Sequence, residues 1–223
     1  MSSIWVYGDS WAYGAGEPGW KDTLDKYTNG HPNSWANQLA GISDKKIINR
    51  GIPANNNLNI ASQIVEDFLS FSKKDIIIVM WTSATRLSFI YNKEFVRPLF
   101  DHKYNYKYNY KTCTIVDKII PPNVFTDNTM DINTAIAISS SLLLLKDFNF
   151  IFTSGFINFT IDNNFLITSN LVNKYSDIWI KKEGFQKLLS AKNLIRDCGH
   201  PNTKGHQLIA FLMYKELIKR NFI

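Results

Sequence analysis

Residues 4–14, IWVYGDSWAYG, carry the first indication of the fold. Four apolar residues, Ile4 to Tyr7, predict a buried strand that runs directly into Gly8, Asp9 and Ser10. A lone pair of aspartate and serine identifies no chemistry, so the meaning of this strand end depends on the rest of the chain.

Further apolar runs of strand length occur at 47–49, 76–81 and 150–153, with a weaker one at 178–180. The run IIIVM, residues 76–80, is apolar throughout, as expected of a strand covered on both faces of a parallel sheet. Helical patterns lie between the runs, and their predicted ranges are 33–39, 60–71, 131–146 and 203–220. This alternation predicts an α/β fold with a parallel sheet between layers of helices.

In the last predicted helix, Leu208, Phe211, Leu212 and Leu217 are expected to share one apolar face. Ligands of such folds bind beyond the carboxyl ends of the strands. The polar residues after the first strand therefore lie where this fold places its chemistry.

The composition is that of one domain. The chain has 223 residues, 45% of them hydrophobic, which is enough for one core, so we expect a single domain over 1–223.

The net charge is +6, but the lysines and arginines are scattered, which argues against specific nucleic-acid binding. Cys113 and Cys198 are too few for a disulfide framework or a zinc site, and no metal or cofactor is predicted.

The chain begins without the basic start and apolar run of a signal peptide. Its longest apolar stretch, around 142–145, is far shorter than the ~18 residues of a membrane span. We therefore expect a soluble cytoplasmic protein with no membrane span.

Residues 92–130 interrupt the alternation and contain DHKYNYKYNYKTC. We expect an insertion here, for which two interpretations are open. It is either a surface hairpin or a flap over the site whose tyrosines stack on a planar ligand such as a sugar ring.

The segment GAGEPG, residues 14–19, fits the pattern G-x-G-x-x-G. A dinucleotide site needs these glycines directly after the strand, and the carboxylate of Glu17 would repel a pyrophosphate. A flexible loop is the expected structure.

The segment DCGHPNTKGHQLIA, residues 197–210, places Asp197 three residues before His200 and just ahead of a helix. A carboxylate this close can hold an imidazole in one tautomer, as the base of a nucleophile requires. Alternatively, the pair only flanks a helix start. A metal site made of Cys198, His200 and His206 lacks a further group of ligands.

Three blocks, YGDSWAYG, INRGIPA and DCGHPNTKGHQLIA, occur in the order found in the SGNH (GDSL-type) hydrolase superfamily, which the chain resembles from residue 4 to about 212. The resemblance implies a three-layer α/β/α sandwich with a flavodoxin-like parallel sheet of about five strands, and ester hydrolysis without metal or cofactor. By this match Ser10 is the nucleophile, His200 the base and Asp197 its orienting partner. The N–H groups of Ser10 and Gly51 would face the oxyanion.

The third block departs from the family pattern. The chain has WTSATR at 81–86, so that Ser83 stands where the family carries an asparagine and Ala84 where it carries an aspartate. The missing donor could be replaced by Ser83, Thr82 or Arg86, or catalysis could be lost. The Trp-Thr-Ser version of this block is associated with phage genomes, which would make the protein virion-associated.

These observations predict a serine esterase that hydrolyses a small acyl ester, with acetyl on a carbohydrate as the expected substrate. The alternative is a catalytically inactive SGNH-fold module that binds a partner or has a structural role. Acyl transfer or thioester hydrolysis would use the same residues. Asp9 either braces the loop that carries Ser10 or is an ordinary turn aspartate. The oligomeric state is not predicted.

Overall fold

The computed structural model of the chain describes residues 2–20, 29–83, 89–91, 94–96, 127–155, 166–181 and 183–223. The strands are β1 (Ser3–Tyr7), β2 (Lys46–Asn49), β3 (Ile76–Trp81), β4 (Phe89–Tyr91), β5 (Glu94–Val96), β6 (Asn149–Ser154) and β7 (Trp179–Ile180). The helices are α1 (Ser10–Tyr13), α2 (Trp35–Ser43), α3 (Asn57–Asp67), α5 (Asp127–Leu145), α6 (Leu166–Lys174), α7 (Phe185–Ser190) and α8 (Thr203–Lys219). Short 3₁₀ turns, η2 (Phe68–Ser70) and η4 (Ser176–Ile178), follow α3 and α6.

Five strands form one parallel sheet in the order β2-β1-β3-β6-β7, while β4 and β5 pair separately as an antiparallel ribbon. In the sheet Val6 pairs with Asn49 on one side and with Ile78 on the other. This is the flavodoxin-like strand order, and the α/β sandwich predicted from the sequence is confirmed. The order reverses between β1 and β3, and the crevice beyond their carboxyl ends is the usual ligand site of such sheets.

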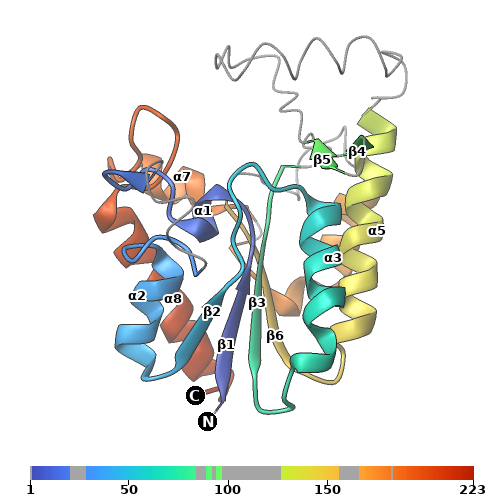
Figure 1. The fold of residues 1–223 in the computed structure, drawn as a ribbon, viewed down its shortest axis with the longest axis horizontal. Coiled ribbons are helices and arrows are strands. Elements are labelled where there is room, and N and C mark those ends of the chain that lie inside the picture. Colours follow the sequence, from blue (N-terminus) through green and yellow to red (C-terminus); the bar gives the residue numbers. More distant parts are fainter. Residues whose placement is uncertain are drawn as a thin grey trace.

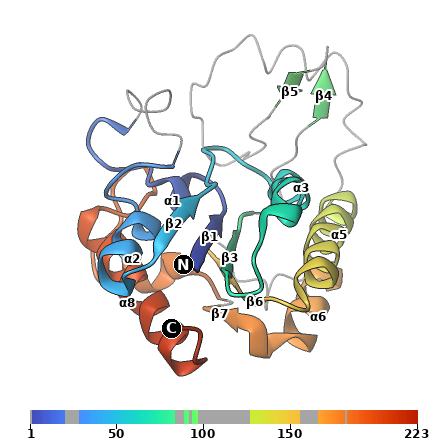
Figure 2. The ribbon, with the colours of Figure 1, turned by 60° about the horizontal axis from the view of Figure 1, so that its bottom comes forward.

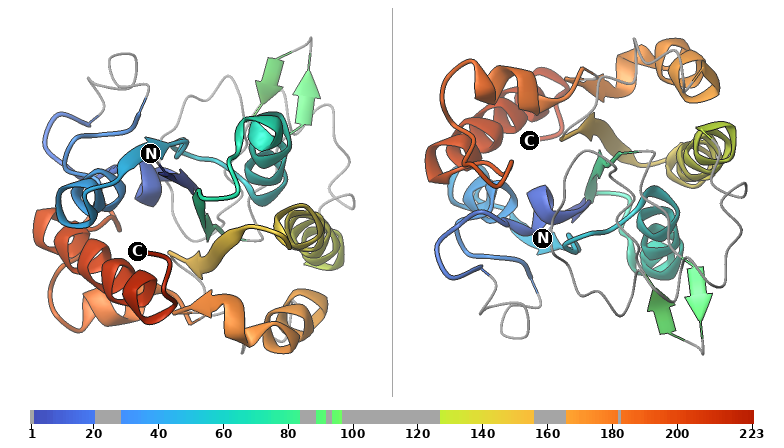
Figure 3. Two further views of the ribbon diagram at one scale, coloured as in Figure 1. Left: turned by 90° about the horizontal axis from the view of Figure 1, so that it is seen from below. Right: turned by 90° about the horizontal axis from the view of Figure 1, so that it is seen from above.

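Helices cover both faces of this sheet (Figure 1). Seen along the strands, α2 and α8 lie on one side and α3 and α5 on the other, with α6 beside α5 (Figure 3). Because side chains alternate along a strand, Ile78 of β3 packs in the core with α2 and α8, whereas Val79 packs in the core with α3 and α5. Every residue of β3 is therefore buried, which explains its unbroken apolar sequence.

Helix α8 is rotated relative to the predicted face. Its buried side chains include Ile209, Met213 and Leu217, whereas Phe211 is 47% exposed. The ammonium group of Lys215 lies 4.6 Å from the centre of the Phe211 ring and partly covers it. Phe211 was predicted to share the apolar face of Leu217, and this was wrong. The buried residues of α8 recur three or four positions apart at 206, 209, 213 and 217, and this spacing leaves Phe211 on another side of the helix.

Helix α5 already begins at Asp127, within the stretch predicted as an insertion. Strand β5 lies in the same stretch and β4 lies just before it, whereas the tyrosine-rich repeat lies outside the described residues. Helices α6 and α7, which the sequence did not predict, follow β6 in the chain and precede α8. Figure 2 shows α6 next to α5. Within the described ranges, none of the helices combines the length and apolar character needed to cross a bilayer.

Candidate active site

Ser10 is the first residue of α1 and follows β1 after a sharp turn at Gly8 and Asp9. The N–H of Trp11 donates to one carboxylate oxygen of Asp9 at 2.9 Å. The hydroxyl of Thr82, just beyond β3, donates to the other at 2.7 Å. Asp9 is only 1% exposed, so one buried carboxylate caps α1 and connects the ends of two adjacent strands. This connection fixes the turn that presents Ser10.

His200 meets Ser10 at this edge of the sheet. The Oγ of Ser10 lies 3.0 Å from Nε2 of His200, although 190 positions separate the two residues. A tight turn holds the histidine, because the N–H of Arg196 donates to the carbonyl of His200 at 2.8 Å and Ile195 forms a β-bridge with Pro201. Helix α8 starts immediately afterwards.

The other ring nitrogen of His200, Nδ1, lies 3.1 Å from the carbonyl oxygen of Cys198. A carbonyl can only accept, so this contact places the proton on Nδ1 and leaves Nε2 able to accept from the serine hydroxyl. The predicted orienting residue, Asp197, is exposed on the same turn. In this structure a backbone carbonyl therefore supplies the contact that selects the tautomer.

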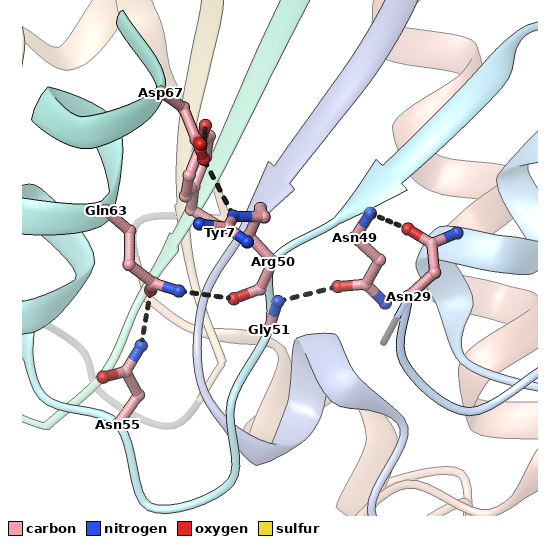
Figure 4. Close-up of polar contacts among 8 residues, drawn as sticks. All are labelled: Tyr7, Asn29, Asn49, Arg50, Gly51, Asn55, Gln63 and Asp67. Atoms are coloured by element: carbon pink, nitrogen blue, oxygen red, sulfur yellow. Dashed lines mark hydrogen bonds and ion pairs between the residues drawn. The ribbon is translucent and has the colours of Figure 1, made fainter. Parts of the chain in front are cut away.

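The predicted oxyanion donors differ in their surroundings. The N–H of Ser10 is at the amino end of α1, where helical N–H groups have no partner within the helix. The N–H of Gly51 donates to Oδ1 of Asn49 at 2.9 Å (Figure 4). A side chain at Gly51 would not fit, because a Cβ there would lie 2.5 Å from the backbone nitrogen of Tyr13. The loop after β2 thus packs directly on α1.

Polar side chains hold this loop from both sides (Figure 4). On one side, Nδ2 of Asn49 donates to the carbonyl of Ala12 at 2.8 Å. On the other, Nε2 of Gln63 in α3 donates to the carbonyl of Arg50 at 3.1 Å, and Asn55 donates to Oε1 of Gln63 at 2.9 Å. The loop is therefore anchored to both α1 and α3.

A second polar cluster joins β1, the same loop and the end of α3 (Figure 4). The hydroxyl of Tyr7 donates to Asp67 at 2.9 Å, and Nε of Arg50 lies 2.8 Å from the same carboxylate oxygen. Burial, with the neighbouring Asp67 carboxylate, raises the pKa of the Tyr7 phenol far above its usual range. Tyr7 is a permanent donor and takes no part in acid–base chemistry.

Three residues, Thr82, Ser83 and Arg86, were predicted as possible replacements for the asparagine donor that the third block lacks. The hydroxyl of Thr82 has a single hydrogen, and Asp9 receives it. Ser83 is half-buried immediately after β3. Arg86 lies outside the described residues. Thr82 gives its hydroxyl hydrogen to Asp9, and Ser83 remains a predicted donor.

The segment 14–19, expected to be a flexible loop, packs against the turn that carries His200 instead. Gly16 has a left-handed backbone with φ of 97°, and Glu17 is 1% exposed. The ring of Trp20 is centred 6.2 Å from that of His200. Nothing in a glycine-rich stretch with one carboxylate distinguishes such a packed loop from a mobile one, so the sequence did not indicate these residues.

His206, considered as a metal ligand, is buried in α8. The N–H of Trp35 donates to its Nδ1 at 3.3 Å, and burial lowers its pKa to about 3, so its ring is neutral near pH 7. Cys198 is exposed. Among the side chains that the structure describes, no group of three or more His, Cys, Asp or Glu is arranged to hold a metal ion.

No protein-family model matches the sequence. No curated protein matches it either. Solved structures match its fold. A member of the lipolytic protein G-D-S-L family from Veillonella parvula DSM 2008 is 11% identical with a TM-score of 0.53, over 96% of this chain and 97% of that one.

Two esterase structures also match the fold of this chain at low sequence identity. The psychrotrophic esterase EstA from Pseudoalteromonas sp., inhibited by monoethylphosphonate, is 11% identical with a TM-score of 0.55, over 98% of each chain. The acetylxylan esterase Axe2 from Geobacillus stearothermophilus is 14% identical with a TM-score of 0.55, over 97% of this chain and 94% of that one. At these identities the likeness shows a shared fold.

Proposed function

We propose that this chain is a serine esterase of the SGNH (GDSL-type) superfamily, with Ser10 as nucleophile and His200 as base. The contact of 3.0 Å between the serine Oγ and Nε2 of the histidine carries the proposal. It lies beyond the carboxyl ends of the strands, where this class of sheet binds ligands. The fold shared with lipolytic proteins and esterases supports the same assignment.

In the proposed reaction His200 accepts the proton of the Ser10 hydroxyl while Oγ attacks the ester carbonyl carbon. The tetrahedral intermediate collapses as the imidazolium donates that proton to the leaving alkoxide, which departs as the alcohol. Water then attacks the acyl-enzyme, with His200 again as base, and releases the carboxylate product and free Ser10. The carbonyl of Cys198 accepts from Nδ1 throughout and stabilises the charged ring.

The oxyanion would be stabilised by the N–H of Ser10 and the hydroxyl of Ser83. The N–H of Gly51 would join them by sharing its hydrogen with Asn49. Removing one oxyanion donor from an enzyme typically costs ~10²–10³ in turnover. Because the N–H of Gly51 is shared with Asn49, we expect turnover to be slower than in an enzyme with three unshared donors.

For the substrate we propose a small acyl ester, such as acetyl, on a carbohydrate. The similar structures include an acetylxylan esterase, and the Trp20 ring beside His200 offers an aromatic surface of the kind that packs against sugar rings. The Lys- and Tyr-rich repeat lies outside the described residues, and stacking of its tyrosines on the sugar remains a prediction.

The test is hydrolysis of p-nitrophenyl acetate by the wild type and by Ser10→Ala and His200→Ala. We expect each variant to lose roughly 10³-fold or more in kcat, because the nucleophile and base act as a unit. Equal rates in wild type and Ser10→Ala would overturn the proposal.

A non-catalytic binding module is the second candidate. It is favoured by two hydrogen bonds that occupy predicted donors, from Gly51 to Asn49 and from Thr82 to Asp9. Stoichiometric labelling of Ser10 by a fluorophosphonate probe would exclude this module, whereas no labelling would support it. Product analysis with an added acceptor alcohol or thiol separates hydrolysis from acyl transfer.

A further inference from the structure

The loop after α1, residues 14–20, packs against the turn that carries His200. A Cβ added to Gly16 would lie 2.6 Å from the Cβ of His200 and 2.9 Å from the carbonyl oxygen of Pro201. The backbone of this loop therefore touches the turn that carries the proposed base, with no room for a side chain between them.

Glu17, the next residue, connects the two segments through its side chain. Its Oε2 accepts from the hydroxyl of Thr203 at 3.0 Å and from Nδ2 of Asn33 at 3.3 Å. Thr203 is the first residue of α8 and follows His200 by three positions. The carboxylate thus joins the loop after α1 to the beginning of the helix that ends the catalytic turn.

The burial of this carboxylate has a physical cost. Glu17 is 1% exposed, and its Oε1 has no hydrogen-bond partner among the described residues. Burying a charge is unfavourable unless other groups compensate for it. Here the amino end of the 17-residue α8 and the Thr203 hydroxyl favour a negative charge. An apolar side chain would fill the same space without this cost. What Glu17 adds is therefore an oriented hydrogen bond to Thr203.

We propose that Glu17 is a positioning residue for the reaction. By holding Thr203, it fixes the start of α8 and hence the turn that keeps Nε2 of His200 against Oγ of Ser10. Glu17 itself touches neither the substrate nor the reacting atoms. The inference rests on the proposed esterase function, and its test includes one measurement that does not need turnover.

The kinetic test uses a variant that removes the Glu17 carboxylate and variants of its hydrogen-bond partner Thr203. Glu17→Ala and Thr203→Val should each lower kcat for p-nitrophenyl acetate roughly 10- to 100-fold, because small misplacements of catalytic groups are costly. KM should stay unchanged within about twofold, since the interaction is not with the substrate. Thr203→Ser, which keeps the hydroxyl, should restore wild-type kcat.

Asn33→Ala is the matched control, because it removes the other hydrogen bond to Oε2 and leaves the contact with Thr203 in place. It should leave kcat at the wild-type value. The proposal is overturned if Glu17→Ala and Thr203→Val keep wild-type kcat, or if Asn33→Ala lowers kcat as much as they do.

The second readout is the ¹⁵N NMR spectrum of the histidine ring nitrogens, recorded across pH for wild type, Thr203→Val and Asn33→Ala. Loss of the positioning contact should shift the Nε2 resonance and the titration midpoint of His200 in Thr203→Val alone. An unchanged His200 signal in Thr203→Val would overturn the proposal even if the protein has no esterase activity. Failure of Ser10 labelling in the wild type would instead overturn the esterase function.

Discussion

The two ring nitrogens of His200 face chemically different partners, and this determines what each neighbour can contribute. Nε2 faces the Ser10 hydroxyl at 3.0 Å, and Nδ1 faces the Cys198 carbonyl at 3.1 Å. A carbonyl selects the tautomer as a carboxylate would, but it carries only a partial charge. The full charge of Asp197 acts from an exposed position, where solvent and salt screen it.

We therefore expect Asp197→Ala to lower kcat/KM for p-nitrophenyl acetate less than about tenfold. Where a carboxylate alone holds the tautomer, its loss costs about 10⁴ in turnover. His200→Ala is the control that should abolish hydrolysis. A loss of about 10³ or more in Asp197→Ala would show instead that the carboxylate orients the ring in solution.

The hydroxyl of Ser83 is the described candidate for the third oxyanion donor, because that of Thr82 is given to Asp9. We expect Ser83→Ala to lower kcat about 10²-fold with KM unchanged, since the interaction forms only in the transition state. Ser83→Asn, which offers an amide donor, should match or exceed the wild-type kcat. Steady-state kinetics check both variants, and wild-type kcat in Ser83→Ala would rule out this role.

The elements of the fold differ in how plainly the sequence predicts them. Strands β1, β2, β3 and β6 were predicted to within a residue at each end, because each contains an apolar run of strand length. Helices α6 and α7 were missed, because they are short and expose apolar residues such as Leu166. Hydrophobic pattern predicts an element only when the element buries most of its apolar side chains.

The candidate site likewise contains residues that the sequence predicted and contacts that it could not predict. The proximity of Ser10 and His200 could be predicted, because their residue types and neighbours match a motif. The contact with the Cys198 carbonyl could not, because every residue has a backbone carbonyl and only the turn determines where it points. Glu17 was assigned to a flexible loop, because its partner Thr203 is 186 positions away.

Asp67 links three elements, and its two partners should matter unequally. Tyr7 is 0% exposed, so Asp67→Ala leaves a buried hydroxyl without its acceptor, at a cost of about 1–3 kcal/mol. The Arg50 side chain is 37% exposed, so Arg50→Ala should cost less than about 1 kcal/mol. In a Tyr7→Phe background the cost of Asp67→Ala should shrink. Urea unfolding measures all four, and equal costs for Arg50→Ala and Asp67→Ala would contradict this order.

In the described part of the molecule, a five-stranded sheet lies between two apolar cores, and the polar groups of the proposed site lie at one edge of that sheet. The core between the sheet, α2 and α8 contains an exception, the imidazole of His206, which is 0% exposed. Its Nδ1 accepts from the N–H of Trp35, so this histidine joins α8 to the start of α2. A neutral ring in this place makes the stability of the entire domain sensitive to acid.

The direction of that sensitivity follows from the two states of His206. Burial lowers its pKa from 6.5 to about 3 in the folded protein, whereas the unfolded chain binds a proton near pH 6.5. Between these values the unfolded state holds the extra proton. The contribution of His206 to stability is therefore complete above pH 6.5 and decreases as the pH falls toward 3, by up to about 1.4 kcal/mol per pH unit.

The variant His206→Asn isolates this contribution, because an amide oxygen can still accept from Trp35 but does not titrate. The carboxylates and the other histidines are common to both proteins, so they cancel in the difference. Urea unfolding at a series of pH values between 3 and 8 should give a shallower loss of stability in the variant below pH 6.5 and parallel curves above it. Parallel curves over the whole range would mean that the imidazole takes up its proton inside the fold without penalty.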